Sequence, residues 1–232
     1  MDPFSFAPIA AILNAAYWVV ESITDLLTPF TGAASAALAI VALTVIVRLA
    51  LIPVGISQSK AEFTRRRLAP KLKELQAKYK KKPEVLQQKT LELYKKENAS
   101  PFAGMLPLLA QAPIISIIYA LFIRTTVDGH ANALLTTPLL GVPLGAHVWA
   151  TAWPGVLVFI ALLAIMGVVA WFNRVIQRRL NPETPAWMTW LPFLSLVFAL
   201  FVPLAAAIYL TVTTAWTLGE RAVLRRKYWV EG

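Results

Sequence analysis

The sequence predicts an all-α polytopic membrane protein with five transmembrane helices, an outside N-terminus and an inside C-terminus. A cytoplasmic antiparallel coiled-coil hairpin and an N-terminal amphipathic surface helix complete this predicted fold. The composition is the first support, because 58% of the 232 residues are apolar, only 15% are charged and the mean hydropathy is +0.62. Such values are typical of a membrane protein. The other two supports are long uncharged runs and basic residues confined to a few tracts between them.

Residues 1–32 are predicted to form an extracytoplasmic amphipathic helix. Such a helix lies on a membrane surface and repeats its apolar residues at helical spacing. The apolar positions are Ile9, Ile12, Leu13, Ala16, Val20, Ile23 and Leu27, and Asn14, Glu21, Asp25 and Thr28 occupy another face. A sixth crossing is the alternative, and it would bury Glu21 and Asp25. The start has no basic n-region, so no cleavable signal peptide is expected.

The transmembrane helices are predicted from run length, since about 20 apolar residues cross the hydrocarbon core of a bilayer. The first three are expected at 33–57, 102–123 and 154–173. Residues 186–219 form one uncharged run of 34 residues, which is too long for a single crossing. Pro203 lies at its centre, where the ring removes a backbone donor and disfavours helical geometry in the preceding residue. Two further helices are therefore expected at 186–202 and 203–219, with a tight turn near Phe201–Pro203.

The basic residues orient these helices. Of the 22 lysines and arginines, 13 lie between residues 57 and 101, three follow the third span and four close the chain. Only Arg124 falls in the loop 124–153. By the positive-inside rule, the insert 58–101, the loop 174–185 and the basic tail 220–232 are cytoplasmic, and the loop 124–153 is extracytoplasmic.

The insert 58–101 is predicted to be the helical hairpin. It carries 13 basic and five acidic residues, a net charge of +8. Mostly apolar residues recur at alternating spacings of four and three on both sides of the helix-breaking sequence KKKP. They are Leu68, Leu72, Leu75 and Tyr79 before it, and Leu86, Thr90 and Leu93 after it. This spacing is typical of two helices that face each other. Its charge favours anionic lipid or an acidic partner. RNA is a competing partner, and the simplest alternative is that the lysines only solvate the hairpin and fix its topology.

Arg48 interrupts the apolar stretch TVIVRLALIPV, about 12 Å from the cytoplasmic end of its helix. An arginine at a span centre costs about 2.5 to 3.5 kcal/mol on insertion scales, and no predicted span contains an acidic residue. We infer a water-filled pocket in which Arg48 supplies positive potential. The alternative is that Arg48 binds neighbouring carbonyls and only joins helices. The candidate walls are the polar residues Thr44, Gln111, Ser195, Tyr209, Thr213 and Thr217, together with Trp216, which shares one helical stripe with Tyr209, Thr213 and Glu220.

Four ordered segments resemble the YidC/Oxa1/Alb3 membrane protein insertases, in the short five-span form found in bacteria, over about residues 36–228. They are TVIVRLALIP, with Thr44 four residues before Arg48; the basic segment from RLAPKLKEL to KKENASP; GMLPLLAQAPIISIIYALF; and MTWLPFLSLVFALFVPLAAAIYL. The chain departs from the family where Leu204 and Ala205 follow Pro203, since a serine and a glycine are often found there.

The resemblance implies a groove that is open to the cytoplasm and to lipid, through which nascent membrane proteins enter the bilayer. Arg48 and Thr44 would line it, Gln111 would lie opposite, and Tyr209 would contact the substrate. The hairpin would receive substrate or ribosome, and its recruiting cations would be Arg65, Arg66, Arg67, Lys71, Lys80, Lys81 and Lys82. The implied partners are nascent membrane proteins and lipids, with the ribosome and a Sec-type translocon as further candidates and no DNA. The implied location is the bacterial plasma (inner) membrane.

Catalysis is not expected, and we predict no catalytic residue, metal or cofactor. The sequence has no cysteine, and His130 and His147 show no metal-ligand spacing such as HExxH. Two other functions compete with insertion. A small-anion transporter or channel subunit would use Arg48 to bind its substrate, although the sequence lacks an inverted repeat. A membrane scaffold would use the hairpin to recruit partners.

Overall fold

A computed structural model describes residues 7–100, 102–103, 105–127, 129–180 and 185–229, without the side chains of 106–108, 110–111, 180 and 225–229. The chain divides into two compact units. Unit 1 comprises residues 1–49 and 114–219, and unit 2 comprises residues 50–113 and 220–232. Both are mainly helical, in agreement with the all-α prediction.

The elements follow one another in this order. Helix α1 spans Ala7–Thr31, η2 Gly32–Ala34, α2 Ser35–Ala50, α3 Ile52–Tyr79, α4 Pro83–Lys96 and α5 Met105–Ile123. The segment after α5 contains β1 at Thr126–Val127, β2 at His130–Ala131, α6 at Ala133–Thr136, β3 at Pro138–Leu139, β4 at Val142–Pro143 and η3 at Val148–Ala150. The chain then forms α7 at Val156–Leu180, η4 at Ala186–Phe193, α8 at Leu194–Ala199 and α9 at Leu204–Trp229.

Helices α1 and α2 are separated by a backbone break. Gly32 has φ +54°, a left-handed conformation that glycine adopts without steric cost. Helix α1 buries Leu13 and Val20 in the core of unit 1, but Trp18 and Phe30 are exposed on its surface. The helix therefore presents apolar side chains away from the core as well as towards it.

Two short hairpins occupy the loop between α5 and α7, where the sequence predicted no strands. Strands β1 and β2 pair antiparallel, and so do β3 and β4. The amide of Asn132 donates to the carbonyl oxygens of Leu121 and Arg124, each at 2.9 Å. Because the last carbonyls of a helix have no partner within the helix, Asn132 completes the C-terminal end of α5.

The start of α9 is held by this same loop. The backbone N–H of Leu204 donates to the carbonyl of Ala146 at 2.9 Å, and that of Ala205 donates to the carbonyl of Leu144 at 2.8 Å. These contacts satisfy donors that a helix N-terminus leaves open. The first turns of α9 are fully packed, since every residue from Leu204 to Tyr209 is at most 5% exposed, and the small side chains of Ala205–Ala207 allow this close approach.

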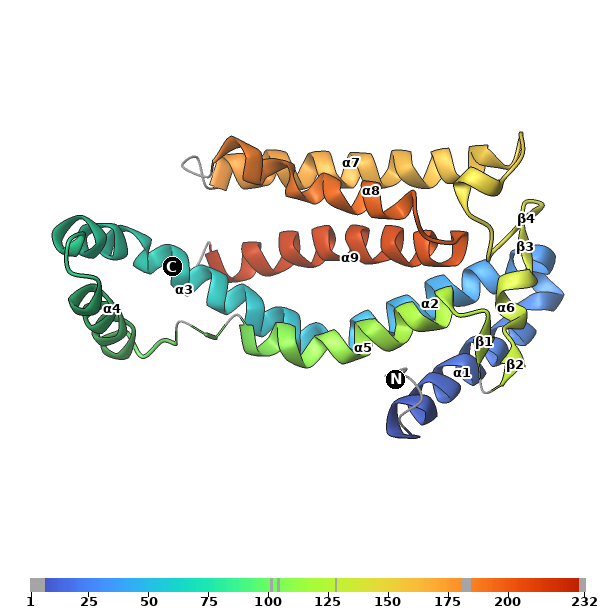
Figure 1. The fold of residues 1–232 in the computed structure, drawn as a ribbon, viewed down its shortest axis with the longest axis horizontal. Helices are drawn as coiled ribbons and strands as arrows, with labels where there is room; N and C mark the ends of the chain where they lie inside the picture. Colours follow the sequence, from blue (N-terminus) through green and yellow to red (C-terminus); the bar gives the residue numbers. More distant parts are fainter. Residues whose placement is uncertain (1–6, 101, 104, 128, 181–184, 230–232) are drawn as a thin grey trace. The chain divides into compact units, whose positions relative to one another are not determined.

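Helices α7, η4 and α8 lie side by side in unit 1 (Figure 1). The segment expected to be one helix over 186–202 is a 3₁₀ helix followed by the short α8. Pro192 lies inside η4, and its missing N–H explains why regular α-helix begins only after it. The chain breaks again between Ala199 and Leu204, which is the position of the turn expected near Pro203.

Unit 2 contains the two helices of the hairpin. In the second half of α3, from residue 69 onward, only Leu72, Leu75 and Tyr79 are not exposed. Helix α4 packs against α3, and its Tyr94 is buried. Pro83 is the first residue of α4, where its missing N–H costs nothing. The half-buried positions of α3 follow the expected leucine spacing, and the coiled-coil pairing of the two helices stays a prediction.

Helix α4 ends in a Schellman motif centred on Asn98. Asn98 has φ +48°, the N–H of Ala99 donates to Tyr94 O at 2.8 Å, and the N–H of Asn98 donates to Lys95 O at 3.1 Å. This pattern terminates a helix and requires a left-handed residue. Asparagine tolerates that conformation better than most residues other than glycine.

The base of α3 packs closely against the continuation of α9 within unit 2. A Cβ atom on Gly55 would overlap the carboxylate of Glu220. Glycine at this position therefore leaves room for the Glu220 carboxylate beside the backbone of α3.

Two helical runs among the described residues are long and apolar enough to cross a membrane, Ala7–Ala50 and Val156–Arg179. Two shorter apolar helices cover Ala112–Ile123 and Ala186–Ala199. The count of five crossings and their orientation stay predictions.

Asn98 gives a direct test of the Schellman motif. We expect Asn98→Ala to lower the free energy of local unfolding at the C-terminal end of α4 by about 1 kcal/mol, because the left-handed conformation is unfavourable for alanine. Asn98→Gly should match or slightly exceed the wild type. Hydrogen exchange of the last-turn amides of α4 measures both, and equal protection in the alanine and glycine variants would contradict the assignment.

Candidate functional site

Arg48 lies on α2, in unit 1, one turn after Thr44. Its side chain is only partly exposed. Among the described residues, no carboxylate forms an ion pair with Arg48 and no side chain hydrogen-bonds to it. The charged group nevertheless lies within electrostatic range of the Tyr209 hydroxyl. Arg48 is therefore a cation without an anionic partner in the described part of an apolar unit.

Three of the predicted residues follow one stripe of α9. Tyr209 is 5% exposed, and the Thr213 side chain approaches its hydroxyl. The Thr213 hydroxyl oxygen and the Trp216 ring nitrogen are buried, and no geometrically acceptable hydrogen-bond partner lies among the described residues. Because a buried polar group without a partner costs about 1 to 3 kcal/mol, this stripe is suited to binding water or a polar ligand.

Tyr209 is fixed by aromatic packing from another helix. Its ring centre lies 5.8 Å from that of Phe122, at an interplanar angle of 48°. Phe122 is fully buried at the end of α5. Tilted pairs at this distance are favourable, so the Tyr209 ring is held in place by Phe122.

The hydroxyl groups of three other predicted residues donate hydrogen bonds to backbone carbonyls three or four residues earlier in the chain. Thr44 donates to Ile40 O at 2.7 Å, Ser195 to Pro192 O at 2.9 Å, and Thr217 to Thr213 O at 2.8 Å. Such back-bonding is common in membrane helices. These hydroxyls can therefore only accept a further hydrogen bond, and Thr44 is additionally 1% exposed in the core. The Gln111 side chain lies outside the described residues.

The predicted recruiting cations of the hairpin differ among themselves. Lys80, Lys81 and Lys82 are exposed at the turn between α3 and α4. Arg65 is exposed, whereas the Nε and Nη2 atoms of Arg66 are buried. Arg67 and Lys71 bind a carboxylate of the hairpin itself, so the turn lysines are the cations best placed for a partner.

That carboxylate belongs to Glu97, which sequence reasoning missed. Arg67 Nη2 lies 3.2 Å from Glu97 Oε2, and Lys71 binds the other carboxylate oxygen. The hydrogen bond from Lys71 lowers the pKa of Glu97, and the charges of Lys71, Arg67 and Lys96 act in the same direction. The pairing depends on the register of α3 against α4, which the sequence pattern alone did not fix.

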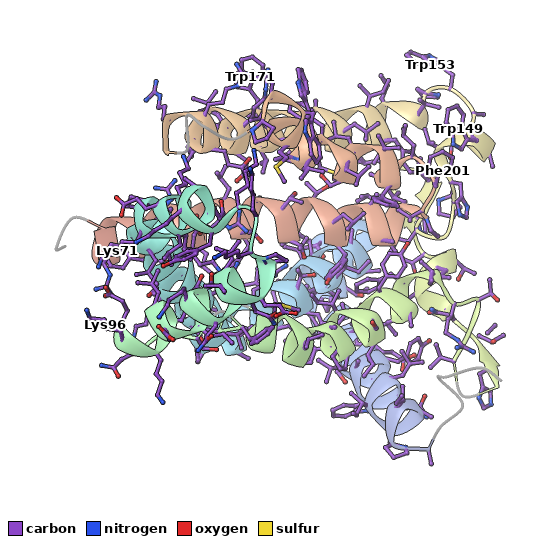
Figure 2. The ribbon with its side chains drawn as sticks, turned by 60° about the vertical axis from the view of Figure 1, so that its left-hand side comes forward. Lys71, Lys96, Trp149, Trp153, Trp171 and Phe201 are labelled. Carbon is purple, nitrogen blue, oxygen red and sulfur yellow. The ribbon has the colours of Figure 1, made fainter. Side chains whose placement is uncertain are left out.

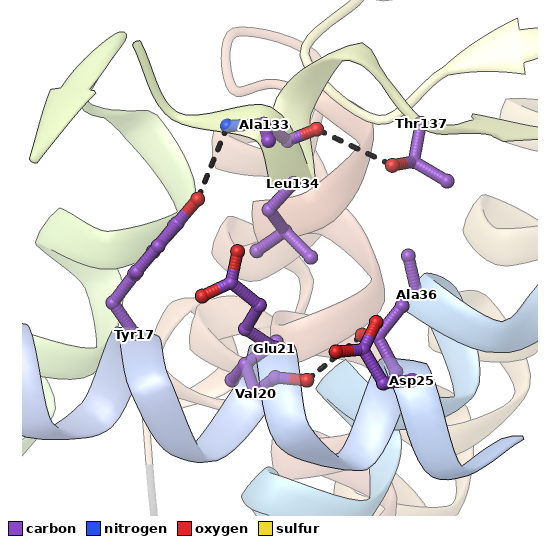
Figure 3. A pocket seen from close by; sticks show the side chains of 9 residues that line it. Tyr17, Val20, Glu21, Asp25, Ala36, Ala133, Leu134 and Thr137 are labelled. Atoms are coloured by element: carbon purple, nitrogen blue, oxygen red, sulfur yellow. Dashed lines mark hydrogen bonds between the residues drawn. The ribbon is translucent and has the colours of Figure 1, made fainter. Parts of the chain in front are cut away.

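A separate cavity of about 170 Å³ lies between α1 and α6 in unit 1. Its lining residues are Tyr17, Val20, Glu21, Thr24, Asp25, Ala36, Ala133, Leu134 and Thr137 (Figure 3). The Tyr17 hydroxyl accepts a hydrogen bond from the Ala133 N–H at 3.3 Å. None of the predicted groove residues lines this cavity, and its two carboxylates give it the opposite charge to Arg48.

The described residues contain no cluster of three or more histidines or carboxylates that could hold a metal ion. His130 lies in β2 and His147 directly precedes η3.

Long apolar helices, a highly basic hairpin and an arginine that has no counter-anion among the described residues are together typical of a membrane protein. Comparison with known proteins identifies it further. Residues 26–230 match the family model described as "60Kd inner membrane protein". The chain therefore belongs to the YidC/Oxa1/Alb3 family, and it is a multi-pass protein of the bacterial inner membrane.

Several relatives are similar over most of the chain. "Membrane protein insertase YidC 2" of Bacillus anthracis is 30% identical over 93% of this chain and 80% of its own length. "Membrane protein insertase YidC" of Clostridium perfringens is 34% identical over 51% of this chain and 50% of its own length. "Inner membrane ALBINO3-like protein 2, chloroplastic" of Chlamydomonas reinhardtii is 26% identical over 94% of this chain and 56% of its own length.

The Glu97 contacts predict a pH-dependent hairpin. Because the pKa of Glu97 is lowered by folding, its ionised form stabilises the hairpin at pH values above its ordinary pKa. This contribution disappears as the pH falls through the lowered value. We expect Glu97→Gln to increase amide exchange in α3 and α4 at pH 7, with the difference from wild type shrinking below about pH 4.

The matched control is Glu74→Gln, which removes an exposed carboxylate from α3. Its exchange should follow the wild type at both pH values. A constant difference between Glu97→Gln and wild type across the acid range would contradict the role of ionised Glu97.

Proposed function

We propose that this protein is a membrane protein insertase that moves nascent membrane proteins into the bilayer through a hydrophilic, positively charged groove. The groove would open to the cytoplasm and to lipid. Family membership and the printed names of the relatives support the insertase activity. The single observation that carries the groove is Arg48, a partly buried cation with no ion-pair or hydrogen-bond partner among the described side chains.

The proposed mechanism lowers an energy barrier and needs no bond chemistry. An unsatisfied polar group in hydrocarbon costs several kcal/mol, so a hydrophilic tail crosses an intact bilayer slowly. A hydrated cavity that reaches part of the way shortens the dry path. The positive charge of Arg48 would attract acidic residues of the incoming segment, and field lines are focused where the walls are apolar.

The other site residues divide between two roles in this proposal. Thr213 and Trp216 would donate hydrogen bonds to water or to the client, and Tyr209 would offer its hydroxyl beside the cation. Thr44, Ser195 and Thr217 would act as acceptors, because their protons are bound to backbone carbonyls. Gln111 is proposed to lie opposite, as the family resemblance implies.

The proposed arrangement in the membrane follows the distribution of charge. It has five crossings, at 33–57, 102–123, 154–173, 186–202 and 203–219, with the N-terminus outside. The hairpin 58–101 would then lie in the cytoplasm, where Lys80, Lys81 and Lys82 are placed to contact the ribosome or an acidic client. A Sec-type translocon is a further proposed partner. At the family level the activity is insertion rather than enzymatic catalysis.

Removing the Arg48 charge tests the groove. We expect Arg48→Ala to slow insertion of a single-span, N-out client with an acidic tail by roughly five- to tenfold, because an attraction of about 1 kcal/mol or more is lost. Arg48→Lys should retain most of the activity. Protease protection of the client in proteoliposomes measures the rate, and equal rates for wild type and Arg48→Ala would refute the role of Arg48.

Two controls separate charge from disruption of the helix. Leu49→Ala truncates the exposed neighbour of Arg48 and should leave insertion unchanged. A client whose tail carries amides in place of carboxylates should lose most of its dependence on Arg48. Measurable uptake of a small anion by the same vesicles would favour the transporter alternative.

A further inference from the structure

A second cationic site lies at the end of α7 in unit 1, around Arg174. The guanidinium carbon of Arg174 lies 3.9 Å from the ring centre of Trp190 and 5.4 Å from that of Trp171. Its Nε atom lies 3.5 Å from the Thr189 hydroxyl, at the long limit of a hydrogen bond. Both ring distances are within the range of a cation–π interaction, so the guanidinium is held by two indoles.

Local helix geometry explains why these side chains meet. Trp171, Arg174 and Arg178 follow one face of α7 at i, i+3 and i+7. A 3₁₀ helix has three residues per turn, so Trp187, Trp190 and Phe193 of η4 share a face. The rings of Trp190 and Phe193 are 5.1 Å apart. Helix η4 packs directly on α7, which places Trp190 against Arg174.

Thr189 fixes the position of η4 at this contact. It is 1% exposed, and its hydroxyl donates to Ala186 O at 2.7 Å. With its proton occupied, the hydroxyl oxygen can only accept, which suits the nearby N–H of Arg174.

The guanidinium keeps its binding capacity in this arrangement. Ring contacts use the face of the guanidinium plane, whereas its N–H donors point outward along the edges. No acidic residue occurs in α7 or η4, and Glu183 lies outside the described residues. In the described part of the site, the N–H donors of the guanidinium edge are therefore available, and no carboxylate neutralises the charge of Arg174. This combination favours a phosphate.

The surface around Arg174 combines exposed aromatic rings with basic side chains. Trp171 is 53% exposed and Trp190 is 50% exposed, and Arg178 and Arg179 are exposed beyond them on α7. Tryptophan is enriched at the boundary between hydrocarbon and headgroups. Exposed indoles beside several arginines therefore match the chemistry of an anionic lipid surface.

The length of α7 places this site at headgroup depth. From Val156 to Arg174 the helix rises about 27 Å, close to the thickness of about 30 Å of a hydrocarbon core. Exposed Trp149 and Trp153 lie near the opposite end of α7, and Trp171 lies towards the Arg174 end (Figure 2). The two aromatic groups mark the two boundaries of one membrane span.

We propose that Arg174, held by Trp171 and Trp190 and flanked by Arg178, binds the phosphate of an anionic phospholipid such as phosphatidylglycerol. The stacked guanidinium donates edge-on to phosphate oxygens, and the indoles lie along the glycerol and upper acyl chains. The surplus positive charge selects a headgroup with net negative charge over a zwitterionic one. This site is independent of the groove around Arg48 and of insertase activity.

Native mass spectrometry of the full-length protein in detergent tests the site, with phosphatidylglycerol or phosphatidylcholine as the probe. We expect Arg174→Gln to weaken phosphatidylglycerol binding by about tenfold, which corresponds to one charge-assisted contact. Arg174→Lys keeps the charge but loses the planar fork, and should lose less. Trp190→Leu should also weaken binding, although it leaves the net charge unchanged. Phosphatidylcholine binding should be weak in every variant.

Arg221→Gln is the matched control, because it removes one exposed positive charge from another helix. It should bind phosphatidylglycerol as the wild type does. Equal losses in Arg174→Gln and Arg221→Gln would overturn the proposal in favour of non-specific attraction. Arg174-dependent binding of a short RNA, with phosphatidylglycerol binding unchanged, would overturn it in favour of a nucleic-acid contact.

Discussion

An arginine without an anionic partner in an apolar helix is the constraint on which the functional interpretation depends. Burial of a charged group is tolerated when another charge, a set of dipoles or water solvates it. The described part of unit 1 offers Arg48 no carboxylate and no side-chain hydrogen bond, and the buried Thr213 hydroxyl oxygen and Trp216 ring nitrogen have no hydrogen-bond partner of acceptable geometry there. Water would satisfy all of these groups at once, and the proposed function requires a hydrated region of this kind for a polar segment to enter the bilayer.

The residues around this region are closely packed. Tyr209 is held by Phe122, and the start of α9 is bound to the loop before α7 through Leu144 and Ala146. The hairpin belongs to unit 2 and has its own ion pairs at Glu97. In the proposed mechanism, unit 1 supplies the polar groove around Arg48, while the hairpin supplies the exposed lysines at its turn for binding clients.

Much of the helical organisation could be predicted from the sequence, because it depends on local chemistry. The proline at 203 in a long apolar run predicted a break, and α9 begins directly after it, while the half-buried positions in the second half of α3 follow the leucine spacing. Features that depend on register or on side-chain geometry could not be predicted in this way. Glu97 pairs with Arg67 across 30 residues, and Arg174 contacts Trp190 on a 3₁₀ segment that the sequence pattern predicted as part of one long helix. The same limit applies to the hydroxyls, since back-bonding of Thr44, Ser195 and Thr217 is decided by rotamers.

Hydration of Arg48 is the property to measure. Solid-state NMR of protein labelled with ¹⁵N-arginine, in bilayers, detects transfer of water magnetisation to each guanidinium, and Arg48→Lys identifies the Arg48 signal by its loss. The account predicts that transfer to Arg48 builds up as fast as transfer to exposed arginines of the hairpin. Build-up as slow as that of the buried amides around Ile40 would mean a dry guanidinium and would contradict the account.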